Sequence, residues 1–480
     1  MAEQPKNLEL NYVIVGPRSP ITLDLFEAER YESAVIVQQL IGNLVYHSNQ
    51  GRYEPRLAKS WERVSPNQWQ FELRENLFCE NGEQITPSRF RESLLRSIKN
   101  LSENREVPIF NKLVGYENLK NGDFAINGIL SNEKTLTFTF NEPVRSGLVE
   151  ILSFAPFGYI SSTNLTAEGH WRDKESFISS GPYVVTQVQV GKRYVLEKNP
   201  CWNLERSSTF PSKVIFTHEV PKSITDSELW IVDNALNSIE PPQGLEPFPL
   251  FPEYLNAILL GNLDSGLFAK KENRSYLRSL IDKHRSSAGI SSTNHIKSET
   301  FYPNQKIEFQ KERTLQPLDL GKEVLTIEGQ EPIEDGSPRF YSWSSLKPAL
   351  DEGGFKYQFA NNSVNWKSMS DPSFDIRLRS SSVGKKLEPW GIGVVFCSNL
   401  GIRLPDPSGK ICALVKSYEQ NQLSEKDFES QFFETIDADC AIIPMSHYGL
   451  QLYISPYINQ NSIHPTLSVM KFDQLEIDSN

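Results

Sequence analysis

The chain has 480 residues, of which 38% are hydrophobic and 23% are charged. Such a composition can bury a sizeable core, which excludes a wholly disordered chain. Lys and Arg number 49 and Asp and Glu number 60, so the formal net charge is −11. This charge argues against binding to nucleic acid or to an anionic membrane surface, and no apolar run approaches the roughly 18–20 residues of a membrane-spanning helix.

An opening strand and two helices are predicted within the first hundred residues. Residues 8–15 are mostly apolar and are followed by Gly16, which predicts an opening strand. Apolar residues spaced as on one helix face predict a helix over residues 33–47. Thr86 followed by Pro87 is typical of an N-cap and a first helical position, so a second helix is expected to begin there.

Alternation of apolar and polar residues predicts the next strands. Residues 69–74 and 134–140 alternate strictly and are expected to form half-buried strands. Residues 183–190 and 193–197 are expected to form a hairpin, because Gly191 stands where a tight turn belongs.

The second half of the chain begins with a Pro-rich stretch over residues 241–252, which reads as a connector. A short strand is expected over 256–260 and an amphipathic helix around 276–281, followed by a long polar surface excursion over 285–320. Further elements are expected as strands over 323–327, 356–360 and 441–444 and as a helix over 425–436. Strands and helices mixed in this order predict an α/β protein of several lobes.

Motifs of nucleotide binding and catalysis are missing from the sequence. It contains no P-loop, no Gly-x-Gly-x-x-Gly, no Gly-x-Ser-x-Gly and no His-Glu-x-x-His. The seven histidines are scattered, which makes a local histidine metal site improbable. We therefore expect a binding protein rather than an enzyme, without a cofactor.

The five cysteines leave two interpretations open. Cys397 and Cys412 enclose a Pro/Gly-rich stretch, where a bridge would constrain a short exposed loop. Alternatively, all five are unpaired thiols in a reducing compartment. The first six residues carry no apolar signal core, so the protein is either cytoplasmic or has had a signal sequence removed.

Four blocks of the sequence resemble the bacterial peptide/nickel solute-binding proteins of family 5, in the order of the family pattern. The blocks are Leu57–Trp61 with 69–74, Asn81–Gly82 and Ile85–Pro87; Ser180–Tyr183 with Leu196–Pro200 and Trp202; Leu260–Asn262 with Arg274 and Leu280–Asp282; and Phe374–Ile376 with Cys397, Cys412 and Ile443–Pro444. Each block is a weak signal alone, but together they cover nearly the whole chain.

The resemblance implies a two-lobed periplasmic-binding-protein fold of type II, cluster C. Such a fold is α/β, with an extra subdomain in the first lobe and a ligand cleft between lobes that close at a hinge. The core of the first lobe is expected from residues 1–42, 160–257 and 450–480, the extra subdomain from 43–159, and the second lobe from 258–449.

The function that the resemblance implies is capture of a peptide or peptide-like ligand by a monomer that delivers it to an ABC permease. It also implies a disulfide between Cys397 and Cys412, and a location at the periplasmic or extracellular face of the membrane, as a secreted protein or lipoprotein. The alternative is a sensor or regulatory descendant of the same fold that binds a small, possibly anionic, ligand or a partner protein. Nucleic acid is not an expected partner.

Positions that match the family's ligand contacts give a set of candidate site residues. They are Tyr31, Glu32, Trp366, Arg377, Arg379, Ser380, Ser381, Ser382, Gly384, Lys385, His447 and Tyr448. Arg377, Arg379 and Ser381 share one side of a strand by period two, and two arginines suit a carboxylate or phosphate. The open alternatives are a solvated strand face for the arginines, a core position for Trp366, a helix cap for Glu32, and surface positions for His447 and Tyr448.

At Gly384 the sequence departs from the family. Peptide-binding members place an Asp at the matching position, where it pairs with the ammonium of the peptide. The aromatic residue expected at Ser381 is also replaced, and Lys385 follows directly. The resemblance therefore leaves the identity of the ligand open.

Overall fold

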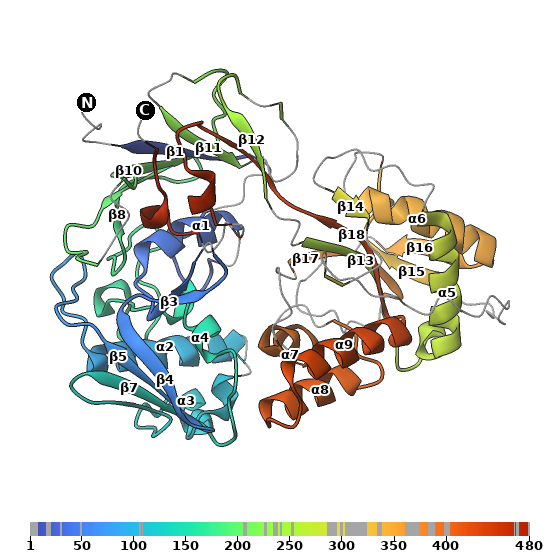
Figure 1. Ribbon diagram of the computed structural model, residues 1–480, viewed down its shortest axis with the longest axis horizontal. Coiled ribbons are helices and arrows are strands. Elements are labelled where there is room, and N and C mark those ends of the chain that lie inside the picture. Colours follow the sequence, from blue (N-terminus) through green and yellow to red (C-terminus); the bar gives the residue numbers. More distant parts are fainter. Residues whose placement is uncertain are drawn as a thin grey trace. The chain divides into compact units, whose positions relative to one another are not determined.

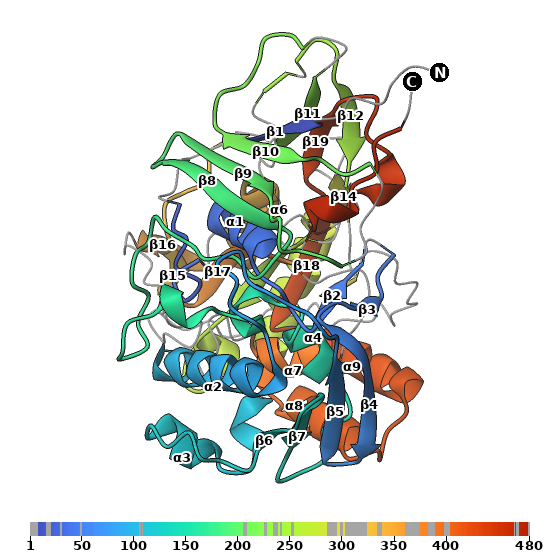
Figure 2. The ribbon, with the colours of Figure 1, turned by 90° about the vertical axis from the view of Figure 1, so that its left-hand side faces the viewer.

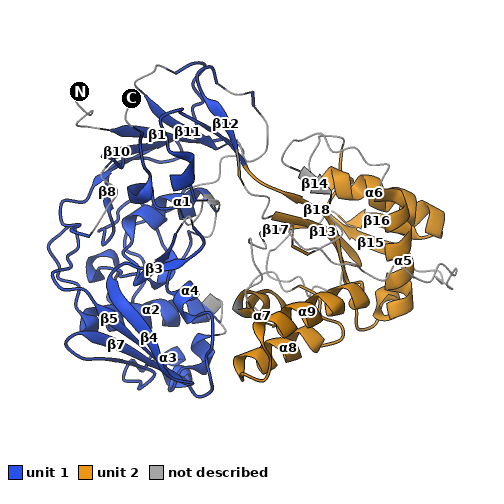
Figure 3. Ribbon diagram, in the orientation of Figure 1, with its two compact units in different colours: residues 1–249, 451–480 blue, residues 250–450 orange. Residues whose placement is uncertain are grey.

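The structure is a computed structural model in which the chain forms two units (Figure 3). Unit 1 comprises Met1–Pro249 and Gln451–Asn480, and unit 2 comprises Leu250–Leu450. The finer division of the first lobe into a core and an extra subdomain stays a prediction. The residues that the structure describes are 8–15, 21–28, 31–48, 50–104, 107, 109–204, 209–224, 228–233, 239–240, 242–250, 254–285, 295–297, 301–302, 324–333, 338–360, 374–382, 389–397, 404–464, 466 and 470–478.

A mixed seven-stranded sheet lies at one end of unit 1 (Figure 1). Across the sheet the strands are β12 (Glu246–Pro249), β19 (Gln451–Ile454), β11 (Leu229–Asp233), β1 (Glu9–Ile14), β10 (Lys213–Thr217), β9 (Arg193–Lys198) and β8 (Tyr183–Gln189). β1 pairs in parallel with both of its neighbours, and the other pairs are antiparallel. The opening strand and the β8–β9 hairpin are therefore confirmed, and Gly191 takes the left-handed backbone of its turn at φ 69°.

The connector predicted over residues 241–252 is partly wrong, because it contains β12. β12 lies at the edge of the sheet and pairs only with β19 among the described strands. An edge strand tolerates Pro247 and Pro249, since one side of it needs no amide donors.

The helix predicted over 33–47 is too long. α1 covers Tyr31–Leu40, and Val45–His47 form β2, which pairs with β3 (Tyr53–Pro55). Gly42 separates the two elements and lies so close to neighbouring backbone that a Cβ there would stand 2.6 Å from the carbonyl oxygen of Ser180. Apolar spacing continued past Leu40 because both elements are buried, and periodicity alone does not separate them.

A four-stranded sheet with a long helix forms another part of unit 1 (Figure 2). The strands are, in order, β4 (Ala58–Ser65), β5 (Gln68–Leu73), β7 (Thr135–Thr139) and β6 (Ile129–Ser131). The helices of this part are α2 (Pro87–Asn104), α3 (Tyr116–Lys120) and α4 (Leu148–Ile151). The predictions of β5, β7 and the start of α2 are confirmed, and the amide of Arg89 donates to Thr86 Oγ1 as an N-cap requires.

Unit 2 contains a six-stranded mixed sheet. Its order is β14 (His295–Lys297), β18 (Ile442–Tyr448), β13 (Tyr254–Leu260), β17 (Ile376–Ser382), β15 (Val324–Glu328) and β16 (Lys356–Ala360). The excursion predicted over 285–320 is partly wrong, because β14 lies within it and Phe301 and Tyr302 are buried. The predicted strands that correspond to β13, β15, β16 and β18 are confirmed.

Helices cover both faces of the unit 2 sheet (Figure 1). One face packs against α5 (Lys271–His284) and α6 (Pro338–Gly353). The other face packs against α7 (Pro389–Cys397), α8 (Lys410–Glu419) and α9 (Glu425–Asp439). Residues of β13 alternate between the two cores, with Ile258 and Leu260 in the first and Ala257 and Leu259 in the second.

Candidate functional site

Two arginines on β17 share one carboxylate in unit 2. Arg379 Nη2 lies 2.6 Å from Glu328 Oε1, and Arg377 Nε lies 3.8 Å from Glu328 Oε2. Glu328 ends β15, which runs parallel to β17. The Glu328 and Arg377 side chains are buried, whereas the Arg379 side chain keeps 21% of its exposure. Arg379 is thus the candidate cation of this cluster that a solute can reach.

The α7–α9 face of the sheet carries this cluster. Arg377 pairs with Leu259 and Arg379 with Ala257 across β13, and residues directly opposite point to the same face. Leu259 and Ala257 belong to the core beneath α7–α9. The expectation that the arginines share one side of the strand is borne out by their common partner Glu328.

Ser380 and Tyr448 lie on the opposite face. Ser380 pairs with Asn256, whose amide donates to Ser342 Oγ of α6 at 2.8 Å. The Tyr448 ring stacks on Tyr254, with centroids 5.3 Å apart. Burial raises the pKa of Tyr448, and a hydrogen bond with Ser380 opposes that shift. The structure therefore brings Ser380 and Tyr448 together, but apart from Arg377 and Arg379.

His447 is fully buried on the α7–α9 side. It pairs with Leu255 across β13, and its Nε2 lies 3.0 Å from the carbonyl oxygen of Phe301. Burial lowers the pKa of His447 from its ordinary value, so the imidazole is neutral at pH 7. A buried neutral histidine that donates to a backbone carbonyl supports packing rather than solute contact.

The remaining candidates are only partly described. Tyr31 begins α1, and Glu32 follows in the first turn with a half-buried side chain. Ser381 and Ser382 complete β17. Trp366, Gly384 and Lys385 lie outside the described residues. Their roles stay predictions.

The disulfide between Cys397 and Cys412 is confirmed, with Cα atoms 5.6 Å apart. The predicted loop between these cysteines lies partly outside the described residues, and its described part, residues 404–409, is irregular and exposed at 407–409. Cys397 ends α7 and Cys412 lies in the first turn of α8, so the bridge joins two helices of the α7–α9 layer. Cys79, Cys201 and Cys440 are outside this bridge.

No metal site is found among the described side chains, since no three His, Cys, Asp or Glu residues there lie close enough together to act as metal ligands. Among the described helices, none has the length and apolar character to cross a membrane.

Sequence reasoning missed Glu328, the partner of both arginines. The signal for it was a carboxylate directly after the predicted strand 323–327.

Comparison with known proteins identifies the family. The family model described as "Bacterial extracellular solute-binding proteins, family 5 Middle" matches residues 52–221. Over this segment the chain is similar to family 5 of the bacterial extracellular solute-binding proteins. The resemblance stated from the sequence blocks is thereby confirmed.

Two curated relatives show how far the sequence similarity extends. The chain is 29% identical over 309 residues to a binding protein of Haemophilus influenzae, covering 63% of this chain and 55% of the relative. It is 24% identical over 191 residues to the periplasmic oligopeptide-binding protein OppA of Escherichia coli, covering 38% of this chain and 35% of the relative. The matches thus span about half, or less, of the length of these relatives.

Similarity of fold extends over nearly the whole chain. The structure of Haemophilus influenzae OppA in complex with RPPGFSPFR matches with a TM-score of 0.70 at 14% identity, covering 98% of this chain and 99% of that one. At this identity the likeness shows the fold alone. The predicted periplasmic-binding-protein fold is therefore confirmed.

Proposed function

We propose that this protein is a solute-binding receptor that captures a peptide or peptide-like ligand and delivers it to an ABC importer. The match of the family 5 model carries this proposal. The OppA relative is named an oligopeptide-binding protein, and the fold matches another OppA along its whole length. The receptor is expected to work as a monomer without catalysis.

The proposed location is the periplasmic or extracellular face of the membrane. The OppA relative is named periplasmic. The Cys397–Cys412 disulfide supports the same location, because structural disulfides persist in oxidising compartments and are rare in the cytosol.

The ligand contact that we propose on unit 2 is a carboxylate bound by Arg379. A guanidinium presents its donors in a planar fork that suits a carboxylate. Glu328 holds Arg379 at 2.6 Å and fixes the direction of the side chain, while the partial exposure of Arg379 leaves it accessible to a solute. A peptide offers such a group at its carboxyl terminus.

Calorimetric titration with a mixture of short peptides tests this proposal, followed by titration with single members and their C-terminal amides. We expect binding of the free acids and weaker binding of the amides. Arg379→Gln should reduce affinity for the free acids and leave affinity for the amides nearly unchanged. Lys356→Gln, at an exposed position on β16 of the same sheet, is the matched control. Failure of every peptide to bind would contradict the peptide ligand.

A second candidate is a sensor of the same fold that binds a small anion without feeding a transporter. The residue that favours it is Gly384, at a position where peptide-binding relatives place an Asp. Without that Asp, the ammonium of a peptide loses its usual partner. A protein that binds small dicarboxylates but no peptides would establish this candidate in place of the first.

A further inference from the structure

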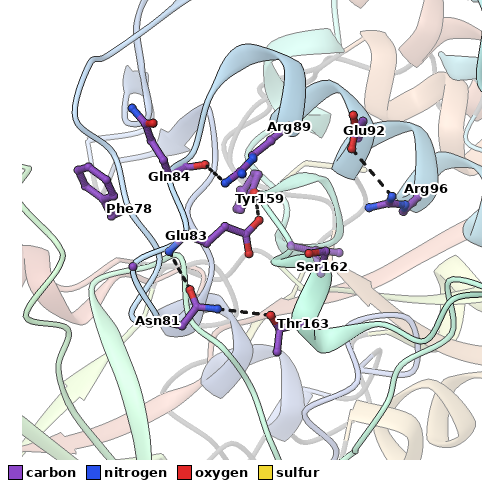
Figure 4. Close-up of a pocket in the computed structure, with 12 residues that line it drawn as sticks. Phe78, Asn81, Glu83, Gln84, Arg89, Glu92, Arg96, Tyr159, Ser162 and Thr163 are labelled. Carbon is purple, nitrogen blue, oxygen red and sulfur yellow. Dashed lines mark hydrogen bonds and ion pairs between the residues drawn. The ribbon is translucent and has the colours of Figure 1, made fainter.

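A cavity of about 820 Å³ lies wholly within unit 1 (Figure 4). Its walls come from the loop before α2, from α2 itself and from the segment before and within the short 3-10 helix Ser162–Asn164. None of the sequence-predicted site residues lines it. Its size lies within the roughly 300–1,000 Å³ of small-molecule sites. Most of its lining side chains carry hydrogen-bonding groups, so it suits a polar ligand.

The floor of the cavity holds a carboxylate in a fixed position. The hydroxyl groups of Tyr159 and Ser161 donate to the two carboxylate oxygens of Glu83, one to each. Tyr159 and Ser161 are buried, and burial together with the Glu83 hydrogen bond raises the pKa of Tyr159, so its hydroxyl stays protonated. Glu83 forms no ion pair with any residue that the structure describes. Its negative charge is held by neutral donors.

A guanidinium lies in the same cavity. Arg89 Nη1 donates to the backbone carbonyl of Gln84 at 3.0 Å, and within the described part of the chain Arg89 also forms no ion pair. Both charges act on Tyr159, where Glu83 raises and Arg89 lowers the pKa of the hydroxyl. The two opposite charges therefore share one neighbourhood without neutralising each other by direct contact.

The other walls are polar and electrically balanced. Asn81 Nδ2 donates to Thr163 Oγ1 at 3.4 Å, which ties the loop before α2 to the 3-10 helix. Arg96 and Glu92 form a loose pair at 3.9 Å with exposed side chains. These groups add no net charge, so Glu83 and Arg89 determine the charge that a ligand should carry.

We propose that this cavity binds a small zwitterion of the amino-acid type, with its ammonium on Glu83 and its carboxylate on Arg89. A simple cation would meet the repulsion of Arg89 and a simple anion that of Glu83, whereas a zwitterion satisfies both charges. Each contact is a charge-assisted hydrogen bond, with the ammonium and the guanidinium as donors. The site is separate from the proposed peptide contact on unit 2 and does not depend on it.

The test uses nuclear magnetic resonance of the full chain with labelled isoleucine δ1 methyl groups. Ile160 lines the cavity, and Ile327 and Ile376 lie in the core of unit 2 as reporters of the other unit. Alanine and dialanine are the probes, with alanine methyl ester and N-acetylalanine as analogues that lack one charge. We expect the zwitterions to shift the Ile160 signal saturably at concentrations up to about 10 mM. The analogues should need at least about tenfold more, the loss of one charged contact.

Variants separate this site from the peptide site. Arg89→Gln, at an exposed position, and Glu83→Gln should each weaken the Ile160 response about tenfold or more. Glu103→Gln, on α2 outside the cavity, is the matched control and should change nothing. Arg379→Gln should also leave the Ile160 response intact. No Ile160 shift with either zwitterion, or shifts with the two analogues at the same concentrations as with the zwitterions, would overturn the proposal.

Discussion

Arg56 and Asp473 form a buried ion pair in unit 1, 417 positions apart in the sequence, with Nη2 and Oδ2 separated by 2.6 Å. Their side chains are 4% and 0% exposed. The Arg56 guanidinium also lies over the rings of Tyr46 and Trp202, at 5.1 and 4.9 Å from their centroids. The C-terminal segment is thereby fixed to elements from the first half of the chain.

Removing one partner of this pair should destabilise the folded protein. Asp473→Asn leaves the Arg56 charge buried without its counter-ion, so we expect a loss of about 3–5 kcal/mol in the free energy of unfolding. Urea unfolding followed by circular dichroism measures it. Glu72→Gln breaks the exposed Lys59–Glu72 pair and should cost less than about 1 kcal/mol. Equal effects of the two variants would show that the buried pair does not stabilise unit 1.

Lys471, next to this pair, should make stability depend on pH. Burial, together with the charge of Arg56, lowers the pKa of Lys471 to about 7, while Asp473 opposes the shift. In the unfolded chain this lysine keeps its proton to about pH 10.4. Between these values the unfolded state binds more protons, so the contribution of Lys471 to stability rises with pH.

Lys471→Met should therefore flatten the pH profile of the free energy of unfolding between about pH 7 and 10. The slope lost is at most about 1.4 kcal/mol per pH unit. Lys471→Met also removes the hydrogen bond from Lys471 to the Gln38 carbonyl. That loss changes the free energy of unfolding by the same amount at every pH, so it does not change the slope. Lys59→Met, at an exposed position, should keep the wild-type slope. Identical slopes for wild type and Lys471→Met would refute a lowered pKa of Lys471 in the folded protein.

The disulfide should stabilise unit 2. Cys397 and Cys412 are 15 positions apart, and a loop of that length corresponds to about 3 kcal/mol in the chain-entropy model. Cys397→Ser should lower the free energy of unfolding by about that amount, and a reducing agent should have the same effect on the wild type. Cys201→Ser removes a cysteine outside the bridge and serves as the control. Insensitivity of the wild type to reduction would contradict a stabilising bridge.

Glu328 should reduce the affinity of Arg379 for a carboxylate ligand. Glu328→Gln removes the negative charge that competes for the two guanidinium groups, so affinity for small carboxylates such as acetate should rise while stability falls. Calorimetric titration at low salt measures the affinity. Unchanged or lower affinity in this variant would contradict competition between Glu328 and the carboxylate for Arg379.

Elements whose cause is local in the sequence were predicted correctly. β5 and β7 alternate because one face of each is buried, and Thr86 with Pro87 placed the start of α2. The end of α1 at Leu40 escaped prediction, because the close approach of Gly42 to Ser180 depends on residues far away in the sequence. α7 and α8 were not predicted, since the Gly and Pro residues near the cysteines are typical of turns.

Candidate site residues were predicted less well. Arg377 and Arg379 were placed on one strand face from period two alone, which the common partner Glu328 bears out. The partner itself comes from another strand, and no local pattern relates the two. The polar cavity of unit 1 was not predicted, because Glu83, Arg89 and Tyr159 are brought together only by the tertiary fold.

Native mass spectrometry of the freshly purified protein, with a peptide mixture added in a second sample, tests the peptide receptor most directly. The account predicts adducts with the masses of short peptides, present on purification or formed on addition, and their reduction in Arg379→Gln. A protein that shows no adduct in either sample, while its unfolding transition remains cooperative, would contradict the peptide receptor.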